Sequence, residues 1–193
     1  MKNPQDSFND ILARKIKWLE IILFYSANGF VYMYLLFKYE GIINIESLSS
    51  TLATLVTMFI FGAIFGIILN FTLGFFIKLT GKLFGGINNL KSIYKVLAWA
   101  HFPSTIYAYL IIVNILLAKI ISQNNNTLII LIGSFIIIIF SIIQLMLAVW
   151  EIFLIYKGLQ MAQKLNVSKT ILNYISSAIL FGMIYHIFIS PFI

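Results

Sequence analysis

The chain has 193 residues, of which 61% are hydrophobic and only 10% are charged, and its formal net charge is +7. A soluble domain typically carries about 25% charged residues, so this chain has too little polar surface for a water-soluble globule. The lack of cysteine excludes disulfides, thiol nucleophiles and cysteine-based metal sites. The lysines flank apolar stretches instead of alternating with aromatic residues, which argues against nucleic-acid binding.

Five stretches are long and apolar enough to cross a bilayer, which requires about 20 residues. They are residues 18–37, 52–79, 96–118, 128–150 and 171–189. Because backbone groups in hydrocarbon must bond internally, we expect helices, and the stretches lack the alternation of barrel strands. The predicted fold is an all-α integral membrane protein, a bundle of five transmembrane helices located in the cell membrane.

The basic residues predict the orientation of this bundle. Eleven of the thirteen lie in the N-terminal tail, around the second connection and around the fourth connection, and only Lys38 and Lys119 lie on the other side. Basic residues concentrate in cytoplasmic loops, so we expect the N-terminus in the cytoplasm and the C-terminus outside. Trp150 then marks the cytoplasmic end of the fourth helix, and Glu151 is expected at the level of the lipid headgroups.

Residues 1–17 form a predicted cytoplasmic tail, and residues 18–193 form one domain that contains the five helices. Apolar side chains of the tail and of the start of the first span fall on one helical stripe, namely Phe8, Ile11, Leu12, Ile16 and Leu19. This stripe predicts an amphipathic helix that lies on the membrane surface. A solvated tail that ends in a basic cluster is the alternative.

A ridge of small residues follows one side of the second stretch, where Gly62, Gly66, Asn70 and Gly74 recur at every fourth position. Such a ridge allows two helix backbones to approach closely. It can serve as a docking face for a partner protein or a second copy of the chain, or it can pack within the bundle. Both interpretations remain open from the sequence.

Polar residues inside the third and fourth stretches suggest a cleft near the cytoplasmic side. Gln144 and Glu151 share one helical face with Ser141 and Ala148, and His101 and Pro103 lie at a similar depth in the third stretch. Polar groups in lipid are costly, so this face is expected to point inward. A His–Glu–Gln set is suited to relaying a proton or binding a cation. Hydrogen bonding between helices is the other interpretation.

Three local expectations concern the third stretch. Pro103 is expected to kink the helix and free a carbonyl near residue 99, and Ser92 is a candidate cap at its start. Glu151 has no basic residue three or four positions further along its own helix, so Lys95 or a cation on a partner protein is its candidate partner. A solvated carboxylate at the membrane surface with no further role is the alternative.

Known catalytic signatures are missing from the sequence. It contains no H-E-x-x-H, G-x-S-x-G, P-loop or G-x-G-x-x-G pattern, and its only two aspartates lie in the tail. We therefore expect no catalytic residues, no metal and no cofactor.

Two segments together resemble the Yip family of small five-span membrane proteins. "FGGINNLKSIYKVLAWAHFP", with Gly85 and Gly86, is similar to the family's entry into the third span. "WEIFLIYKGLQMAQKLNVSKT", with Trp150 and Gly158, is similar to its exit from the fourth span. The chain looks like a short bacterial-type member. The resemblance covers spans two to five and implies that residues 18–193 form a five-helix Yip-like domain.

The resemblance limits the functions to consider. Eukaryotic members bind Rab-type GTPases through a long cytosolic tail, and the short tail here means that this activity is not transferred. Some bacterial members occur beside ABC export systems. The expected function is a non-enzymatic accessory protein that binds and stabilises or regulates another membrane protein, with an ABC-type exporter as the expected partner. The alternatives are a small transporter or channel that uses the polar cleft, and a lipid-organising protein; the expected partners are membrane lipids, exporter subunits and a second copy of the chain.

Overall fold

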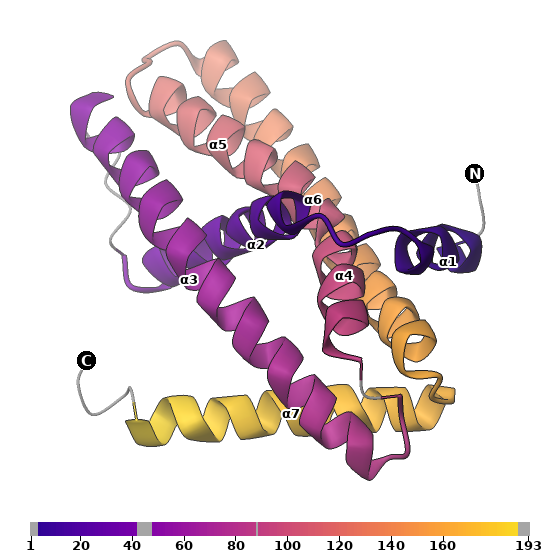
Figure 1. Ribbon diagram of the computed structural model, residues 1–193. Helices are drawn as coiled ribbons and strands as arrows, with labels where there is room; N and C mark the ends of the chain where they lie inside the picture. The colour runs from indigo at the N-terminus through magenta and orange to yellow at the C-terminus, as the bar shows by residue number, and fades with distance from the viewer. Residues whose placement is uncertain (1–3, 42–47, 88, 189–193) are drawn as a thin grey trace. The chain divides into compact units, whose positions relative to one another are not determined.

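The computed structural model describes residues 4–41, 48–87 and 89–188, and every regular element within these ranges is a helix (Figure 1). The helices are α1 (Pro4–Ala13), α2 (Trp18–Tyr39), α3 (Leu48–Leu83), α4 (Leu90–Ala100), α5 (Phe102–Ser122), α6 (Thr127–Gln163) and α7 (Val167–Phe188). The predicted all-α class is confirmed.

Four helical stretches of the described chain are long and apolar enough to cross a membrane. They are Trp18–Tyr39, Ser49–Leu83, Leu90–Ser122 and Thr127–Gln163. Together they support a multi-pass membrane protein. The fifth predicted span falls largely on α7, which is not among these four, and part of it lies outside the described residues. The count of five spans and the outward C-terminus therefore stay predictions.

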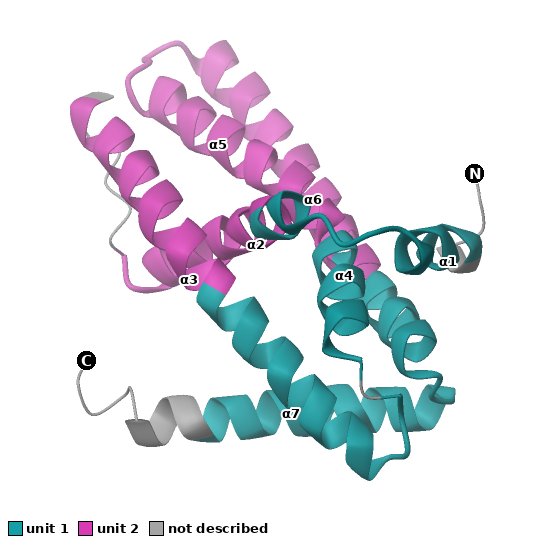
Figure 2. Cartoon of the chain, viewed as in Figure 1, with its two compact units in different colours: residues 1–22, 68–100, 152–193 teal, residues 23–67, 101–151 magenta. Residues whose placement is uncertain are grey.

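The chain divides into two compact units, shown in different colours in Figure 2. Unit 1 consists of residues 1–22, 68–100 and 152–193, and unit 2 consists of residues 23–67 and 101–151. Helices α2, α3 and α6 each contribute to both units. The described basic residues on the predicted cytoplasmic side all belong to unit 1, whereas Lys38 and Lys119 belong to unit 2.

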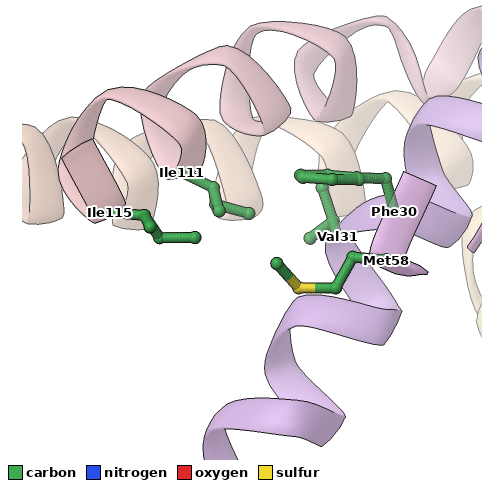
Figure 3. Packing of buried hydrophobic residues seen from close by; sticks show 5 residues of the cluster. All are labelled: Phe30, Val31, Met58, Ile111 and Ile115. Atoms are coloured by element: carbon green, nitrogen blue, oxygen red, sulfur yellow. The ribbon is translucent and has the colours of Figure 1, made fainter. Parts of the chain in front are cut away.

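Unit 2 has an apolar core built from three helices. Its cluster of buried side chains contains Phe30 and Val31 of α2, Met58 of α3, and Ile111 and Ile115 of α5 (Figure 3). Unit 1 buries its own apolar residues, among them Phe8, Ile77, Ile93, Leu97 and Leu159. Each unit thus buries apolar side chains from several segments that are distant in the sequence.

The third predicted span is interrupted. Helix α4 ends at Ala100, His101 is a turn residue, and α5 begins at Phe102 with Pro103 in its first turn. Because Pro103 has no N–H, it cannot bond to the carbonyl of residue 99, which agrees with the predicted break. The expected cap at Ser92 is wrong: Asn89 Oδ1 accepts a hydrogen bond from the Ser92 N–H at 3.3 Å, so Asn89 caps α4.

The fourth helix is longer than predicted. Helix α6 continues past Trp150 to Gln163, because Ile155, Leu159 and Ala162 form a buried stripe in unit 1. The helix ends at Gln163, and the next residue, Lys164, adopts a left-handed backbone with φ of 53°. Asn166 then caps α7, since its Oδ1 accepts a hydrogen bond from the Lys169 N–H at 3.0 Å.

Candidate functional site

A buried polar cluster of unit 2 surrounds the carboxylate of Glu151. The Nδ1 atom of His101 lies 2.6 Å from Oε1 of Glu151, and the amide of Asn28 donates to the same oxygen at 3.2 Å. The hydroxyl of Ser104 donates to the other oxygen, Oε2. Asn28 also donates to the Ser104 hydroxyl at 3.2 Å, so the four side chains form one connected network.

Three helices of unit 2 supply this cluster. Asn28 comes from α2, Glu151 from α6 and Ser104 from the first turn of α5, with His101 as the residue just before α5. The break before α5 is what places His101 outside the regular helix. A 3.0 Å bond from the Ser104 N–H to the His101 carbonyl holds the two residues in one tight turn. The aromatic ring of Tyr25 packs edge-on against the imidazole, with ring centroids 6.0 Å apart.

The cluster is buried well enough for these hydrogen bonds to matter. Asn28, His101 and Ser104 are each at most 2% exposed, and the side chain of Glu151 is 14% exposed. A carboxylate removed from water is tolerated only when several donors compensate for its lost hydration. The side chains of Asn28 from α2 and of His101 and Ser104 at the start of α5 surround the carboxylate from α6, so the cluster stabilises the packing of α2, α5 and α6.

The chemistry of the cluster is that of a buried acid–base pair. His101 and Glu151 can share a proton, and they form an ion pair when both imidazole nitrogens are protonated. The arrangement differs from a Ser–His–acid triad, because the Ser104 hydroxyl donates to the carboxylate and not to the imidazole. The geometry is therefore suited to holding or exchanging a proton.

The other predicted cleft residues behave differently from one another. Pro103 is buried in the first turn of α5, and it directly precedes Ser104 of the cluster in the sequence. Gln144 is buried on α6, about two turns before Glu151, and its Nε2 has no hydrogen-bond partner among the described residues. Ser141 is exposed and bonds back to the Ile137 carbonyl, so the predicted inward face does not extend to it.

The candidate partner of Glu151 is engaged elsewhere. Lys95 of α4 donates to the backbone carbonyls of Leu12, at 3.0 Å, and Arg14, both at the end of α1. The sequence left open a contact of Glu151 with Lys95 or a partner's cation, and a solvated carboxylate at the membrane surface. In the structure the Glu151 carboxylate contacts His101, Ser104 and Asn28 instead.

The small-residue ridge of α3 faces other parts of the same chain. A Cβ on Gly66 would lie 2.5 Å from Cα of Gly29 in α2, and one on Gly62 would lie 2.8 Å from Cα of Phe30. These distances are shorter than any contact that a real Cβ makes, so the α2 and α3 backbones meet directly in unit 2. Further along α3, Asn70 is 1% exposed, and a Cβ on Gly74 would lie 2.5 Å from the Tyr94 ring in unit 1.

The motif glycines lie at turns and close contacts of unit 1. Gly85 has a φ of +81°, a left-handed conformation that favours glycine. The N–H of Gly86 donates to the Gly81 carbonyl at 2.9 Å. A Cβ on Gly158 would lie 3.0 Å from both Phe8 of α1 and Val96 of α4. Trp150 is 40% exposed on α6.

A second polar network, in unit 1, was not predicted. Asn173 of α7 donates to Oε1 of Gln163, Gln163 donates to the Ile77 carbonyl at 3.1 Å, and the Thr80 hydroxyl donates to Oδ1 of Asn173. The Gln163 carbonyl also accepts from the Ile87 N–H at 2.8 Å, which ties the turn after α3 to the end of α6. The three side-chain contacts join α3, α6 and α7 to one another.

Sequence reasoning also missed Asn28 and Ser104. The available signal was an amide in the middle of an otherwise apolar first span, and a hydroxyl three residues after His101. Either residue alone is common in membrane helices, so the spacing did not indicate which polar groups meet.

The chain matches a known protein family. A family model described as the Yip1 domain matches residues 1–189. No curated protein and no solved structure matches the chain.

Proposed function

The chain belongs to the Yip1 family, as its motifs predicted, and we propose that it is a non-enzymatic accessory protein that binds and stabilises another membrane protein. The observation that carries the proposal is the exposed apolar side of α6. In the most apolar part of this helix only 11% of the residues are buried, against 39% in the corresponding part of α2. A helix that contributes so little to its own bundle leaves a long surface for lipid or for a partner's helices.

One stripe of this surface is suited to contact with a partner helix. Ile138, Ile142, Leu145 and Val149 recur at helical spacing, and each is more than half exposed. Association between helices in lipid depends on close packing and not on a hydrophobic gain, so the shape of such a stripe determines which partner fits. An ABC-type exporter is the partner that the resemblance to short bacterial members favours.

Co-purification in a mild detergent tests this proposal. We expect a membrane protein to co-purify with the wild-type chain and to be lost from Ile142→Ala/Leu145→Ala, because these exposed side chains contribute to the contact and not to the fold. Phe61→Ala/Ile64→Ala is the matched control, since both residues are exposed on α3 of the same unit. Equal recovery of the partner with both double variants contradicts a role for α6. Subunits of an ATP-driven exporter among the recovered proteins support the finer assignment.

A second candidate function rests on the His101–Glu151 pair. An ionisable pair inside a membrane-spanning region is often part of a proton or cation pathway. Under this alternative, Glu151→Gln and Gln144→Leu both abolish the flux of a solute or of protons across the membrane of reconstituted vesicles, while the protein still inserts and folds. Under the accessory proposal, vesicles with the wild-type protein show no flux above empty vesicles.

A further inference from the structure

A basic pocket lies within unit 1, where the end of α1, the link to α2 and helix α4 meet. Its lining includes Arg14, Lys15, Lys17, Glu20, Lys95 and Trp99. Four of these side chains are cationic and one is a carboxylate. The pocket therefore concentrates positive charge in a region that the sequence already places beside the cytoplasmic surface of the membrane.

The internal contacts of the pocket neutralise only part of this charge. Glu20 pairs with Lys17, with a distance of 2.9 Å between Nζ and Oε1. Lys95 is fixed by its bonds to the carbonyls of Leu12 and Arg14, which are uncharged acceptors. No described residue forms an ion pair or a side-chain hydrogen bond with the cationic groups of Arg14 or Lys15. Three cations held close together repel one another unless an anion lies between them.

Apolar surface continues directly from the pocket. The first residues of α2 expose large apolar side chains, with Trp18 46% exposed and Leu19 70% exposed. The indole of Trp99 belongs to the lining of the pocket itself. Tryptophan is enriched where a protein crosses from headgroups to acyl chains, so the ligand that fits this surface has an anionic end and an apolar end.

We propose that this pocket binds the phosphate headgroup of an anionic phospholipid, with the acyl chains along the start of α2. Arg14 and Lys15 contact the phosphate oxygens. The guanidinium of Arg14 presents paired N–H donors that match these oxygens, and Lys15 contributes an ammonium group. Lys95 holds the end of α1 in place and adds a third positive charge. Basic pockets between helices on the cytoplasmic side recognise lipid headgroups in this manner. The site is independent of the partner protein proposed above.

Native mass spectrometry of the full chain tests the proposal. The protein is released from micelles that contain equal amounts of phosphatidylglycerol and phosphatidylcholine with identical acyl chains, and the retained lipids are counted. We expect retention of phosphatidylglycerol by the wild-type chain and about a tenfold or greater loss of its affinity in Arg14→Gln/Lys15→Gln, because each basic residue near an anionic headgroup contributes about 1 kcal/mol. Arg14→Lys/Lys15→Arg keeps both charges and should retain the lipid.

The matched control is Lys82→Gln/Lys169→Gln, which removes the same charge from exposed positions of unit 1 outside the pocket. It should bind phosphatidylglycerol as the wild type does. An equal loss in both double variants would assign the effect to overall charge and overturn the proposal. Displacement of the lipid by millimolar inorganic phosphate would overturn the lipid assignment in favour of a free anion. Equal retention of the two lipids, together with loss of a co-purifying protein from the pocket variant, would assign the pocket to an acidic protein segment instead.

Discussion

His101 and Glu151 lie 2.6 Å apart, between Nδ1 and Oε1, although fifty residues separate them and both belong to otherwise apolar segments. The contact joins the break before α5 to the middle of α6. Ser104 and Asn28 complete the set of donors around the carboxylate. The pair is therefore both a structural tie in unit 2 and the one described acid–base pair of the chain whose two members are largely buried.

Removal of the Glu151 carboxylate is predicted to destabilise the protein. Glu151→Ala removes the buried carboxylate that the Asn28, His101 and Ser104 side chains share and should lower the free energy of unfolding by about 2–4 kcal/mol. Glu151→Gln keeps one acceptor oxygen and should cost about 1 kcal/mol. Thermal unfolding in detergent measures both changes. Glu20→Gln is the control, because its exposed ion pair with Lys17 contributes about 0–1 kcal/mol, and a Glu151→Ala effect no larger than this control refutes the prediction.

Gly66 is predicted to tolerate no side chain. Gly66→Ala places a methyl group against the α2 backbone at Gly29 and should lower the stability by about 1–3 kcal/mol, and Gly66→Leu should lower it further. The control is Gly182→Ala in α7, where a Cβ would meet nothing within 4 Å and a gain in helix propensity is expected. Equal melting temperatures for Gly66→Ala and Gly182→Ala would show that α2 and α3 separate in the membrane.

The helices were predictable because lipid imposes one simple requirement, a continuous apolar stretch with internal backbone bonds. Their ends were less predictable, as α6 shows. Its apolar run stops near Trp150, but the helix continues because Ile155 and Leu159 pack in unit 1, and that packing depends on segments distant in the sequence.

The candidate site was also predictable only in part, because its contacts join segments that are distant in the sequence. Polar residues within apolar spans indicated His101 and Glu151, since their burial is costly without a compensating contact. The spacing along one helix could not show that Asn28 of α2 and Ser104 of α5 complete the cluster. Lys95 was a candidate partner of Glu151 because both residues were expected at the same membrane surface. In the structure Lys95 instead donates to the Leu12 carbonyl at the end of α1.

The network of Gln163 and Asn173 is predicted to act as a coupled pair. Gln163→Leu and Asn173→Leu should each cost about 1–3 kcal/mol, because each leaves the other amide buried without its partner. The double variant should cost less than the sum of the two by at least about 0.5 kcal/mol. Chemical unfolding in detergent gives the three values. Ser141→Ala is the control second site, since Ser141 is exposed and bonds within its own helix, and its effect should add to that of Gln163→Leu.

The last prediction concerns the orientation in the membrane. The described basic residues of the predicted cytoplasmic side all belong to unit 1. The positive-inside rule then predicts that the connection between α5 and α6 lies outside the cell and that the turn between α6 and α7 lies inside. The chain has no cysteine, so Ser122→Cys and Ser168→Cys each introduce a single thiol at an exposed position, at the end of α5 and in the first turn of α7, next to these two connections. A membrane-impermeant maleimide on intact cells should label Ser122→Cys, whereas Ser168→Cys should react only after permeabilisation. The unlabelled wild-type chain is the blank, and labelling of Ser168→Cys alone on intact cells would reverse the orientation.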